Sequence, residues 1–531
     1  MNTAEPREHR VARLSELAPA PSMQPFEIGE TKGLLVRLPD GLYAVDGLCP
    51  HAKAPLHEGA LCGRRLVCPW HQSVFDVSSG ALLDPPSLDG LASYPVRIAG
   101  GDVFVTLSAP TPPAPPFVPR GRRTVLIVGA GAAGQVAAET LRQEGFDGRI
   151  VLVGPQPEPP YDRTNLSKHF LSGKAQREDL PLRPAPGFFD RIGVKRKVAT
   201  VTRLAAREKN ATLSDGETLG YDAAILATGG MPRPLDVPGS DHPRVRLLRT
   251  VADAERIIAL APGKGSRAVA VGASFIGMEA VSSLAQRGVE VTVLASDDVP
   301  FERQLGREVG ASIRRLHEQH GVQFLPRAKV ARFEDAPGEL RVILTSGESI
   351  VADVAIVGVG VRPAADFVEG IQRADDGGIV VDESLHAGHG LYAVGDIANF
   401  PLPTTGERVR IEHWRVAQQH GALAARNVAR PESRQTLHDS GFVPFFWTYH
   451  FEQRMNHVGF AREWDEIIFD GDPAAPPFIV YYLHQGRTIA AAGTHRDADL
   501  AALHELLRLN RAPTATQLRA GGYSPLVDIR S

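Results

Sequence analysis

Two stretches of this 531-residue chain repeat one pattern, and the repeat restricts the fold more than any other feature. Residues 124–154 read TVLIVGAGAAGQVAAETLRQEGFDGRIVLVG: an apolar strand, a glycine turn, an alanine-rich helix and a second strand. Residues 267–296, RAVAVGASFIGMEAVSSLAQRGVEVTVLAS, repeat the same order. Short apolar runs that alternate with helices indicate parallel strands buried on both faces. The chain is therefore expected to contain two α/β units.

The turn of each unit is typical of a dinucleotide site. Glycines at this spacing allow a tight turn, close approach of a pyrophosphate and close packing of helix on strand, and the helix N-terminus offers free N–H groups. The alternative is a unit that has kept its shape and lost its ligand. The first turn contains Gly129, Gly131 and Gly134, and the second contains Gly272, Ser274 and Gly277.

The residue after the second strand of such a unit usually contacts a ribose, and an acidic residue there favours NADH over NADPH. In the first unit this strand leads to Gln156, which can still bond a hydroxyl. In the second unit it leads to Ala295, with Asp297 and Asp298 close behind and no arginine at that place. We therefore expect weak discrimination between the two nicotinamide cofactors, with a lean to NADH.

A second feature lies upstream, where the motifs CPH and CPWH, with sixteen residues between them, supply two cysteines and two histidines. The four side chains are Cys49, His51, Cys68 and His71. Such a set can hold zinc or a [2Fe–2S] cluster. Each half supplies one Cys and one His, as a cluster with two Cys on one iron and two His on the other requires, so iron is favoured over zinc. Cys62 is expected to be a plain buried thiol.

Composition restricts the function class. The formal net charge of −3 argues against nucleic acid as the main partner. No apolar run approaches the ~20 residues of a membrane span, and the start of the chain has no apolar signal core. Three cysteines leave no disulfide framework, so a reducing cytoplasm is expected.

The cysteine- and histidine-containing stretches, CPHAKAPLHEGAL and CPWHQSVFDVSSGALLDPP, resemble a Rieske ferredoxin domain. High-potential members of that family carry an extra cysteine in each stretch and a tyrosine that donates to a ligand sulfur. Here Trp70 stands at one of the cysteine positions and Phe75 at the tyrosine position, while Ser73 is kept. Because fewer donors stabilise the reduced cluster less, the resemblance implies a low potential.

The rest of the chain resembles the pyridine nucleotide-disulfide oxidoreductase superfamily, in its ferredoxin reductase and apoptosis-inducing-factor branch. The motifs are YDRTNLSK, LATGG, VGVGVRPAADF, LYAVGDIANF, EHWRVAQQHG and FFWTYH. The whole chain is similar to apoptosis-inducing-factor-like fusions of a Rieske domain with a flavoprotein. The implied fold class is multidomain, with an all-β Rieske domain, two α/β dinucleotide-binding domains for FAD and NAD, and a C-terminal α+β domain. The expected boundaries are 11–107 for the Rieske domain, 108–121 for a Pro-rich linker, 122–252 and 381–430 for the FAD domain, 253–380 for the NAD(P)H domain, and 431–531 for the C-terminal reductase or interface domain.

The resemblance also implies roles for individual residues. Lys168 and Glu279 would meet beside the flavin and act in catalysis. The implied FAD-binding residues are Gly129, Gly131, Gly134, Gln156, Arg163, Lys168, Thr228, Gly229, Asp396, Trp414 and Trp447. The implied NAD(P)H-binding residues are Gly272, Ser274, Gly277, Glu279, Gly358 and Gly360.

The flavoprotein part has no cysteine, so it cannot reduce a protein disulfide, and the cluster is the natural acceptor instead. The expected function is transfer of electrons from NAD(P)H through FAD and a Rieske [2Fe–2S] cluster to a one-electron acceptor: an oxygenase, a cytochrome P450, a ferredoxin or a haem protein. The alternative is a redox-responsive binding protein or a slow NADH oxidase with a regulatory cluster. The resemblance leaves both a monomer and a homodimer open.

Overall fold

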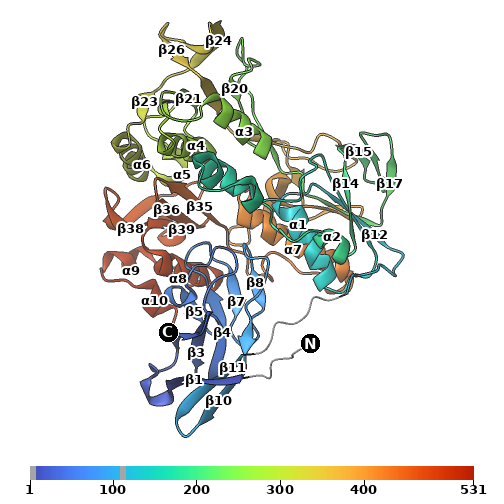
Figure 1. The fold of residues 1–531 in the computed structure, drawn as a ribbon, viewed down its shortest axis with the longest axis vertical. Helices are drawn as coiled ribbons and strands as arrows, with labels where there is room; N and C mark the ends of the chain where they lie inside the picture. Colours follow the sequence, from blue (N-terminus) through green and yellow to red (C-terminus); the bar gives the residue numbers. More distant parts are fainter. Residues whose placement is uncertain (1–6, 108–114, 531) are drawn as a thin grey trace. The chain divides into compact units, whose positions relative to one another are not determined.

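The computed structural model describes residues 7–107 and 115–530, and Figure 1 draws their helices and strands. Of the expected linker at 108–121, residues 108–114 lie outside the described residues. The chain separates into two compact units. One contains the described residues up to 107 with 441–447 and 455–530, and the other contains 116–440 with 448–454. Within the described ranges no helix is long and apolar enough to cross a membrane.

The second unit holds the first glycine turn in a six-stranded sheet of order β14-β13-β12-β18-β32-β31. The first five of these strands run parallel. Residues 125–128 of β12 are at most 3% exposed, as expected for a strand covered on both faces. The elements are β12 (Thr124–Val128), α1 (Ala132–Gln143), β13 (Arg149–Gly154), β14 (Val194–Val198), β18 (Ala223–Leu226), β31 (His386–Gly388), β32 (Leu391–Ala393) and α7 (Trp414–Ala429).

Helices α1 and α7 lie side by side in Figure 1, and a glycine explains how close they come. A Cβ atom at Gly421 of α7 would overlap the carbonyl oxygen of Ala133 in α1. The two backbones therefore touch, and this contact fixes α7 beside the glycine turn.

The second glycine turn belongs to a five-stranded, wholly parallel sheet of order β20-β27-β21-β22-β23 in the same unit. Helix α4 joins β21 to β22, so both expected α/β units are present. The elements are β20 (Val245–Arg246), α3 (Val251–Leu260), β21 (Arg267–Val271), α4 (Phe275–Gln286), β22 (Glu290–Ala295), α6 (Arg307–Gln319), β23 (Gln323–Pro326) and β27 (Val354–Val357).

The first unit is built from antiparallel sheets. Three small sheets come from the N-terminal segment, and their strand orders are β2-β3-β4-β9, β1-β11-β10 and β5-β6-β7-β8. A fourth sheet, of order β35-β36-β39-β38-β37, comes from the C-terminal segment, and helix α8 packs against it. The elements are β1 (Arg7–Arg13), β2 (Ser22–Ile28), β3 (Thr31–Leu38), β4 (Gly41–Asp46), β5 (Ala60–Cys62), β6 (Arg65–Val67), β7 (Val74–Asp76), β8 (Leu82–Asp84), β9 (Ser93–Tyr94), β10 (Val96–Ala99), β11 (Asp102–Leu107), β35 (Phe445–His450), β36 (Gln453–Gly459), β37 (Glu466–Asp472), β38 (Ala475–His484), β39 (Arg487–Thr494) and α8 (Asp497–Arg508).

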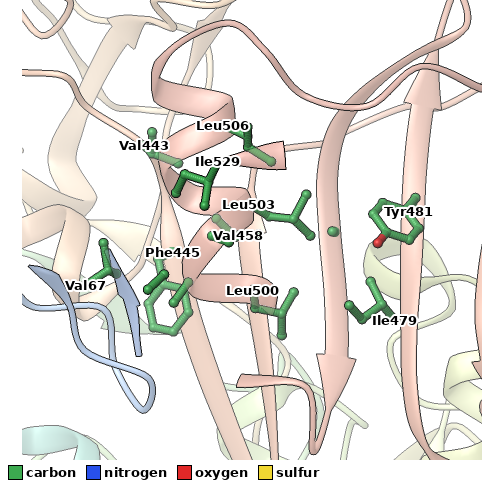
Figure 2. Close-up of a cluster of buried hydrophobic side chains, with 14 of the residues drawn as sticks. Val67, Val443, Phe445, Val458, Ile479, Tyr481, Leu500, Leu503, Leu506 and Ile529 are labelled. Atoms are coloured by element: carbon green, nitrogen blue, oxygen red, sulfur yellow. The ribbon is translucent and has the colours of Figure 1, made fainter. Parts of the chain in front are cut away.

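One hydrophobic core joins the two ends of the chain in this unit (Figure 2). Val67 and Val74, on β6 and β7, pack in the same cluster as Phe445, Leu500 and Leu503. The sequence assigned these segments to different domains. They share a core because the sheet of β5, β6 and β7 has two apolar faces. One face contributes Val67 and Val74 to the shared core. The other contributes Leu66 and Phe75 to a second cluster, which contains Cys49 and Cys68.

Candidate cluster and dinucleotide sites

The four expected cluster ligands lie on two loops with the same backbone geometry. In each loop the cysteine N–H donates to the carbonyl five residues later, at 2.9 Å for Cys49 and 2.8 Å for Cys68. The N–H four residues later returns a bond to the cysteine carbonyl, at 2.8 and 3.2 Å. The returning residues, Lys53 and Gln72, have left-handed φ values of 61° and 57°. The two loops therefore present their ligands in equivalent positions.

The ligands form one pair of thiols and one pair of imidazoles. Cys49 and Cys68 are each 1% exposed, whereas the His51 and His71 rings are half-buried with centroids 4.8 Å apart. Hydrogen bonding to the Cys68 thiol lowers the pKa of Cys49 to about 7. Across residues 7–107 and 115–530, no three His, Cys, Asp or Glu side chains gather as ligands of a single ion. Two separate pairs suit the two irons of a [2Fe–2S] cluster better than one zinc ion.

Three other side chains line this site. The Ser73 hydroxyl hydrogen-bonds the Cys49 thiol and accepts from Ser87 N–H at 2.9 Å. Phe75 is fully buried in the apolar core and has no hydroxyl to donate. The Trp447 ring lies 4.5 Å from the His71 ring between centroids, so this tryptophan lies beside an expected cluster ligand.

Cys62 lies away from this set, on β5, and is half-buried against the core in Figure 2. Burial raises its pKa, with the charge of Glu505 adding to the effect. A protonated thiol is a poor ligand, which agrees with the expected structural role.

The first glycine turn fits an FAD pyrophosphate. Gly129 has φ +108°, and a Cβ atom at Gly134 would overlap the Gly129 carbonyl oxygen, so turn and helix are in contact. A Cβ atom at Gly131 would meet nothing within 4 Å, which leaves open space in front of the helix. Gly131 is the N-cap of α1 and no side chain caps its N–H groups. These donors and this space suit a bound phosphate.

The side chains expected around the FAD form two groups. In one, Arg163 Nη2 donates to Gln156 Oε1 at 2.7 Å and Gln156 Nε2 donates to Tyr161 at 2.9 Å. Burial lowers the pKa of Arg163 to about 10, and the nearby charge of Arg249 adds to this. An arginine that is short of counter-charge suits an anionic ligand such as a phosphate.

The second group surrounds Asp396. This carboxylate accepts from Gly230 N–H at 3.1 Å and lies 3.7 Å from Arg249. Thr228 donates from its hydroxyl to Ala364 O at 2.6 Å, and Gly229, with φ +68°, lets the chain turn beside Arg249. Trp414 is the first residue of α7 and is half-buried.

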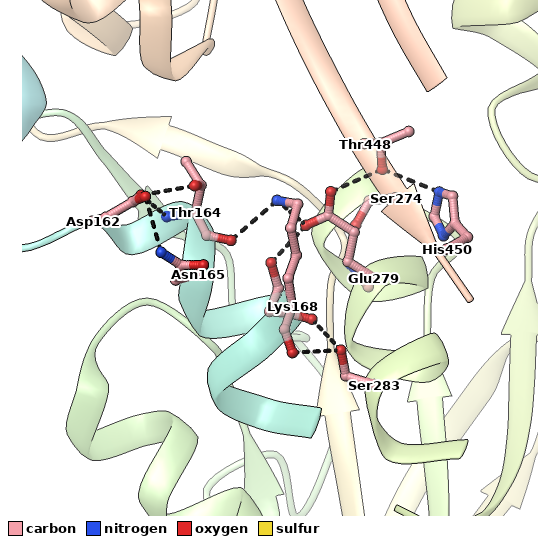
Figure 3. Close-up of polar contacts among 11 residues, drawn as sticks. Asp162, Thr164, Asn165, Lys168, Ser274, Glu279, Ser283, Thr448 and His450 are labelled. Atoms are coloured by element: carbon pink, nitrogen blue, oxygen red, sulfur yellow. Dashed lines mark hydrogen bonds and ion pairs between the residues drawn. The ribbon is translucent and has the colours of Figure 1, made fainter. Parts of the chain in front are cut away.

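Lys168 and Glu279 meet in the structure (Figure 3). Lys168 Nζ lies 2.9 Å from Glu279 Oε2, and both side chains are less than 10% exposed. Ser167 donates to the same oxygen at 2.6 Å, and Thr448 donates to Glu279 Oε1 at 2.8 Å. With both carboxylate oxygens bonded, Glu279 is held in one orientation.

The second glycine turn fits a dinucleotide with one difference. Gly272 has φ +96°, and a Cβ atom there would lie 2.5 Å from Gly358 O. Ser274 caps α4, because its hydroxyl accepts from Gly277 N–H at 3.3 Å. The serine therefore occupies one of the N–H groups that a glycine would leave free. Gly360, with φ +106°, has open space where a Cβ atom would stand.

A cavity of about 420 Å³ lies at the end of β22, where the ribose of a dinucleotide is expected. Asp297 and Asp298 line it, together with Arg303 and Arg327. Arg327 makes two bonds of 2.9 Å to Asp298, and Arg303 lies 3.6 Å from Asp297. The sequence has no arginine next to Ala295, but the fold brings two arginines to this cavity.

Sequence reasoning missed several residues of these sites. Thr448 and His450 follow Trp447 in the motif FFWTYH, where only the tryptophan stood out. Arg249, Arg303 and Arg327 lie in segments with no motif, so only the fold could show that they reach the sites.

Comparison with known proteins agrees with this geometry. Residues 7–95 match the Rieske [2Fe-2S] domain, residues 123–421 match the pyridine nucleotide-disulphide oxidoreductase family, and residues 445–524 match the reductase C-terminal domain. Apoptosis-inducing factor 3 of Mus musculus is 35% identical over 508 residues, which cover 92% of this chain and 82% of that protein.

Bacterial reductases are also similar. Rhodocoxin reductase of Rhodococcus erythropolis is 32% identical over 74% of this chain and 91% of its own length. Among solved structures, the covalent putidaredoxin reductase–putidaredoxin complex superposes with a TM-score of 0.72 and 30% identity, covering 77% of this chain and 99% of that one. The chain belongs to the pyridine nucleotide-disulphide oxidoreductase family, as an NAD(P)H-dependent FAD reductase that carries an N-terminal Rieske [2Fe–2S] domain.

Proposed function

We propose that this protein takes a hydride from NAD(P)H at its FAD and sends the electrons out singly through the Rieske cluster to a separate acceptor protein. The observation that carries this proposal is the position of the cysteines. All three lie between residues 49 and 68, so the flavoprotein part has no thiol to receive electrons. Two of the three belong to the ligand set, which makes the cluster the one-electron carrier of the chain.

The acceptor is proposed to be an oxygenase, a cytochrome P450, another ferredoxin or a haem protein. This class is supported by the relatives, which include rhodocoxin reductase and the reductase component of an anthranilate 1,2-dioxygenase system. The proposed compartment is the cytoplasm, whose reducing conditions suit three unpaired thiols. Both a monomer and a homodimer fit this function.

Lys168 and Glu279 are proposed to lie beside the reacting edge of the flavin. The Lys168 ammonium would stabilise negative charge that develops on the flavin, and Glu279 would orient the lysine and meet the nicotinamide. Their buried ion pair and their three further hydrogen bonds support this role, because a preorganised charge is worth most where water is excluded.

Replacing one ligand tests the electron exit. Cys68→Ser should keep the yellow FAD and still accept hydride, because the second unit has its own core, but it should lose the visible absorbance and the reduced-state paramagnetic resonance of the cluster. Reduction of a protein acceptor should then fall by at least about 100-fold, while small acceptors that reach the flavin still turn over. Cys62→Ser is the matched control and should keep both cluster and rate.

Two results would contradict the proposal: an unchanged rate of protein reduction in Cys68→Ser, or stoichiometric zinc with no iron in the parent.

A second candidate, a redox-responsive binding protein, is favoured by the 35% identity with apoptosis-inducing factor 3. Turnover separates the two, since a reductase reduces a one-electron acceptor rapidly, whereas a binding protein forms a long-lived reduced complex that turns over little.

A further inference from the structure

A continuous line of hydrogen bonds leads away from Glu279 through α4, β35 and α6. Thr448 Oγ1 donates to Glu279 Oε1 at 2.8 Å and lies 3.0 Å from His450 Nε2. His450 Nδ1 lies 3.2 Å from His317 Nε2. Figure 3 shows the first part of this line, from Lys168 through Glu279 and Thr448 to His450. The four linked groups come from three separate segments, all within the second unit.

The hydrogen-bond roles in this line follow from its two ends. The single Thr448 hydroxyl proton is donated to Glu279 Oε1, so Thr448 must accept from His450 Nε2–H. His450 Nδ1 then has no proton and accepts from His317 Nε2–H. Both rings are neutral in this arrangement, and every bond donates toward Glu279. His317 Nδ1, at the far end, has no hydrogen-bond partner among the described residues.

Burial explains why both imidazoles stay neutral. His450 is 1% exposed and His317 is 0% exposed. Burial lowers the pKa of His450 to about 4, opposed by the charge of Glu279 and by a backbone bond to Met278, while Lys168 adds to the lowering. Burial, with His450 and His320 nearby, holds the pKa of His317 well below its usual range.

The far end of the line approaches solvent. His320, the C-cap residue of α6 and one turn beyond His317, is exposed, and its ring stacks on Phe451 with centroids 3.9 Å apart. The Phe451 ring also meets the His317 ring edge-on at 4.9 Å. His317 Nδ1 is therefore a buried acceptor one helical turn from a solvent-exposed imidazole.

We propose that His317, His450 and Thr448 form a proton relay that delivers a proton to Glu279 when the flavin is reduced and returns it when the electrons leave. A proton that arrives at His317 Nδ1 displaces the Nε2 proton to His450 Nδ1. The His450 Nε2 proton then moves to Thr448, and the Thr448 proton moves to Glu279 Oε1. After this passage every bond donates in the opposite direction, so the line is set to carry the proton back.

The charge balance gives the relay a purpose, and this step rests on the proposed place of Lys168 and Glu279 beside the flavin. A hydride from NAD(P)H adds one hydrogen and one negative charge to the site. Protonation of Glu279 cancels that charge and frees the Lys168 ammonium from its counter-ion. When the two electrons pass to two one-electron acceptors, the hydride hydrogen leaves as a proton and the relay proton returns to solvent. Two protons are then released and one was taken up earlier, so the net release is one proton per NAD(P)H oxidised.

The test compares proton uptake with the bleaching of the flavin. Rapid mixing of the holoprotein with NAD(P)H, in weak buffer with a pH-indicator dye, should show in the parent one proton taken up per hydride, in step with the loss of flavin absorbance. The glutamine amide in His450→Gln can hydrogen-bond but cannot pass a proton on. In this variant the rate of proton uptake should therefore be at least about tenfold lower than the rate of flavin bleaching. A histidine that only positions Glu279 would slow both signals together.

Further variants keep the proposal testable if His450→Gln does not fold. Thr448→Val removes the hydroxyl at constant shape, so proton uptake should again be slower than flavin bleaching. Thr448→Ser keeps a hydroxyl, so uptake and bleaching should again occur together. The control is His386→Gln, which changes a half-buried histidine packed on Tyr392 and should leave both signals unchanged. No uptake in the parent, or uptake in step with bleaching in both relay variants, would overturn the relay. A flavin that NAD(P)H does not reduce would instead refute the proposed function, and photochemical reduction would still test the relay.

Discussion

The Arg65 guanidinium, on β6, lies 2.9 Å from the Glu505 carboxylate on α8, although 440 positions separate the two residues. Glu505 is 0% exposed and also accepts from Arg508 at 2.7 Å. Burial alone would raise the Glu505 pKa, but bonds from His504 and Arg65 hold it well below its usual range. The ion pair therefore ties the strands that carry the cluster loops to the C-terminal helix.

Removing this carboxylate should destabilise the first unit strongly. Glu505→Ala removes the buried carboxylate that Arg65 and Arg508 share and leaves Arg65 only Asp84, at 3.5 Å. Breaking a buried pair costs about 3–5 kcal/mol. Denaturant unfolding followed by cluster absorbance measures the loss. Glu8→Ala, which breaks the exposed Arg97–Glu8 pair of 2.6 Å, should cost little, because solvent screens that pair. Equal losses in the two variants would show that the buried pair does not hold the unit together.

Lys168→Ala should slow hydride transfer more than it weakens FAD binding. Loss of one preorganised charge at a reacting group typically costs about 10²-fold in rate, whereas the FAD keeps its pyrophosphate contacts at the glycine turn. Rapid-mixing reduction and FAD titration of the same variant give the two numbers. Lys174→Ala, which loses only an exposed contact with Glu452, should change neither. A variant that binds FAD poorly but reduces it at the parental rate would contradict the catalytic role.

Nicotinamide choice should depend on the carboxylates of the cavity at β22. In the parent we expect kcat/KM for NADH to exceed that for NADPH modestly, because Asp297 and Asp298 neutralise Arg303 and Arg327. Asp298→Asn should free Arg327 for a 2′-phosphate and shift the ratio toward NADPH by about tenfold, the worth of one charge-assisted bond. Asp366→Asn, in the exposed pair with Arg362 and Arg373, is the control. A hundredfold preference of the parent for NADPH would refute this expectation.

The cluster potential should follow the number of donors to its ligand sulfurs. Ser73→Ala removes the hydroxyl bonded to Cys49 and should lower the potential, and Phe75→Tyr should raise it by offering a new donor. One hydrogen bond of about 1 kcal/mol corresponds to about 40 mV for a single electron. Spectroelectrochemical titration measures the shifts, with Ser79→Ala as the control because its hydroxyl bonds Asp76 instead. A rise in potential in Ser73→Ala, or a fall in Phe75→Tyr, would contradict this account.

Buried histidines should make the protein sensitive to mild acid. Burial lowers the pKa of His457 to about 4, below the value of about 6.5 in an unfolded chain. The unfolded state then binds the extra proton, so stability falls as pH drops below about 6.5. Between pH 7 and 5 the parent should lose about 2 kcal/mol more unfolding free energy than His457→Gln. The control His495→Gln, at an exposed histidine, should lose as much unfolding free energy as the parent. If His457→Gln also lost as much as the parent, the prediction would be contradicted.

The features that could be predicted from the sequence are those that local chemistry determines. Gly129 and Gly272 require positive φ, and their turns revealed both α/β units. The spacing of Cys49 and His51 against Cys68 and His71 indicated the cluster before any fold was known. The ion pair of Lys168 with Glu279 came from family resemblance, because nothing in the local sequence says that two charges 111 positions apart will meet.

The remaining features depend on tertiary packing. Arg303, on the short helix α5 (Glu302–Leu305), and Arg327, directly after β23, reach the cavity at β22 only through the fold of the chain around that sheet. His317 sits on an amphipathic helix where a lone histidine is easily taken for a core residue, and only the position of His450 gives it a partner. The shared core of the first unit was missed because each end of the chain also reads as a separate domain.

That shared core also imposes an order on the making of the protein. The amide of Gln72, in the second cluster loop, donates to Leu500 O at 3.0 Å across 428 positions of sequence. At a synthesis rate of about 5–20 residues per second, Leu500 leaves the ribosome roughly 20–90 s after Gln72. During that interval the nascent β6 and β7 lack the partners for one apolar face. The face of β6 and β7 that packs on Leu500 and Leu503 is thus covered only after α8 has been synthesised, so we expect the cluster to be held stably only from that point on.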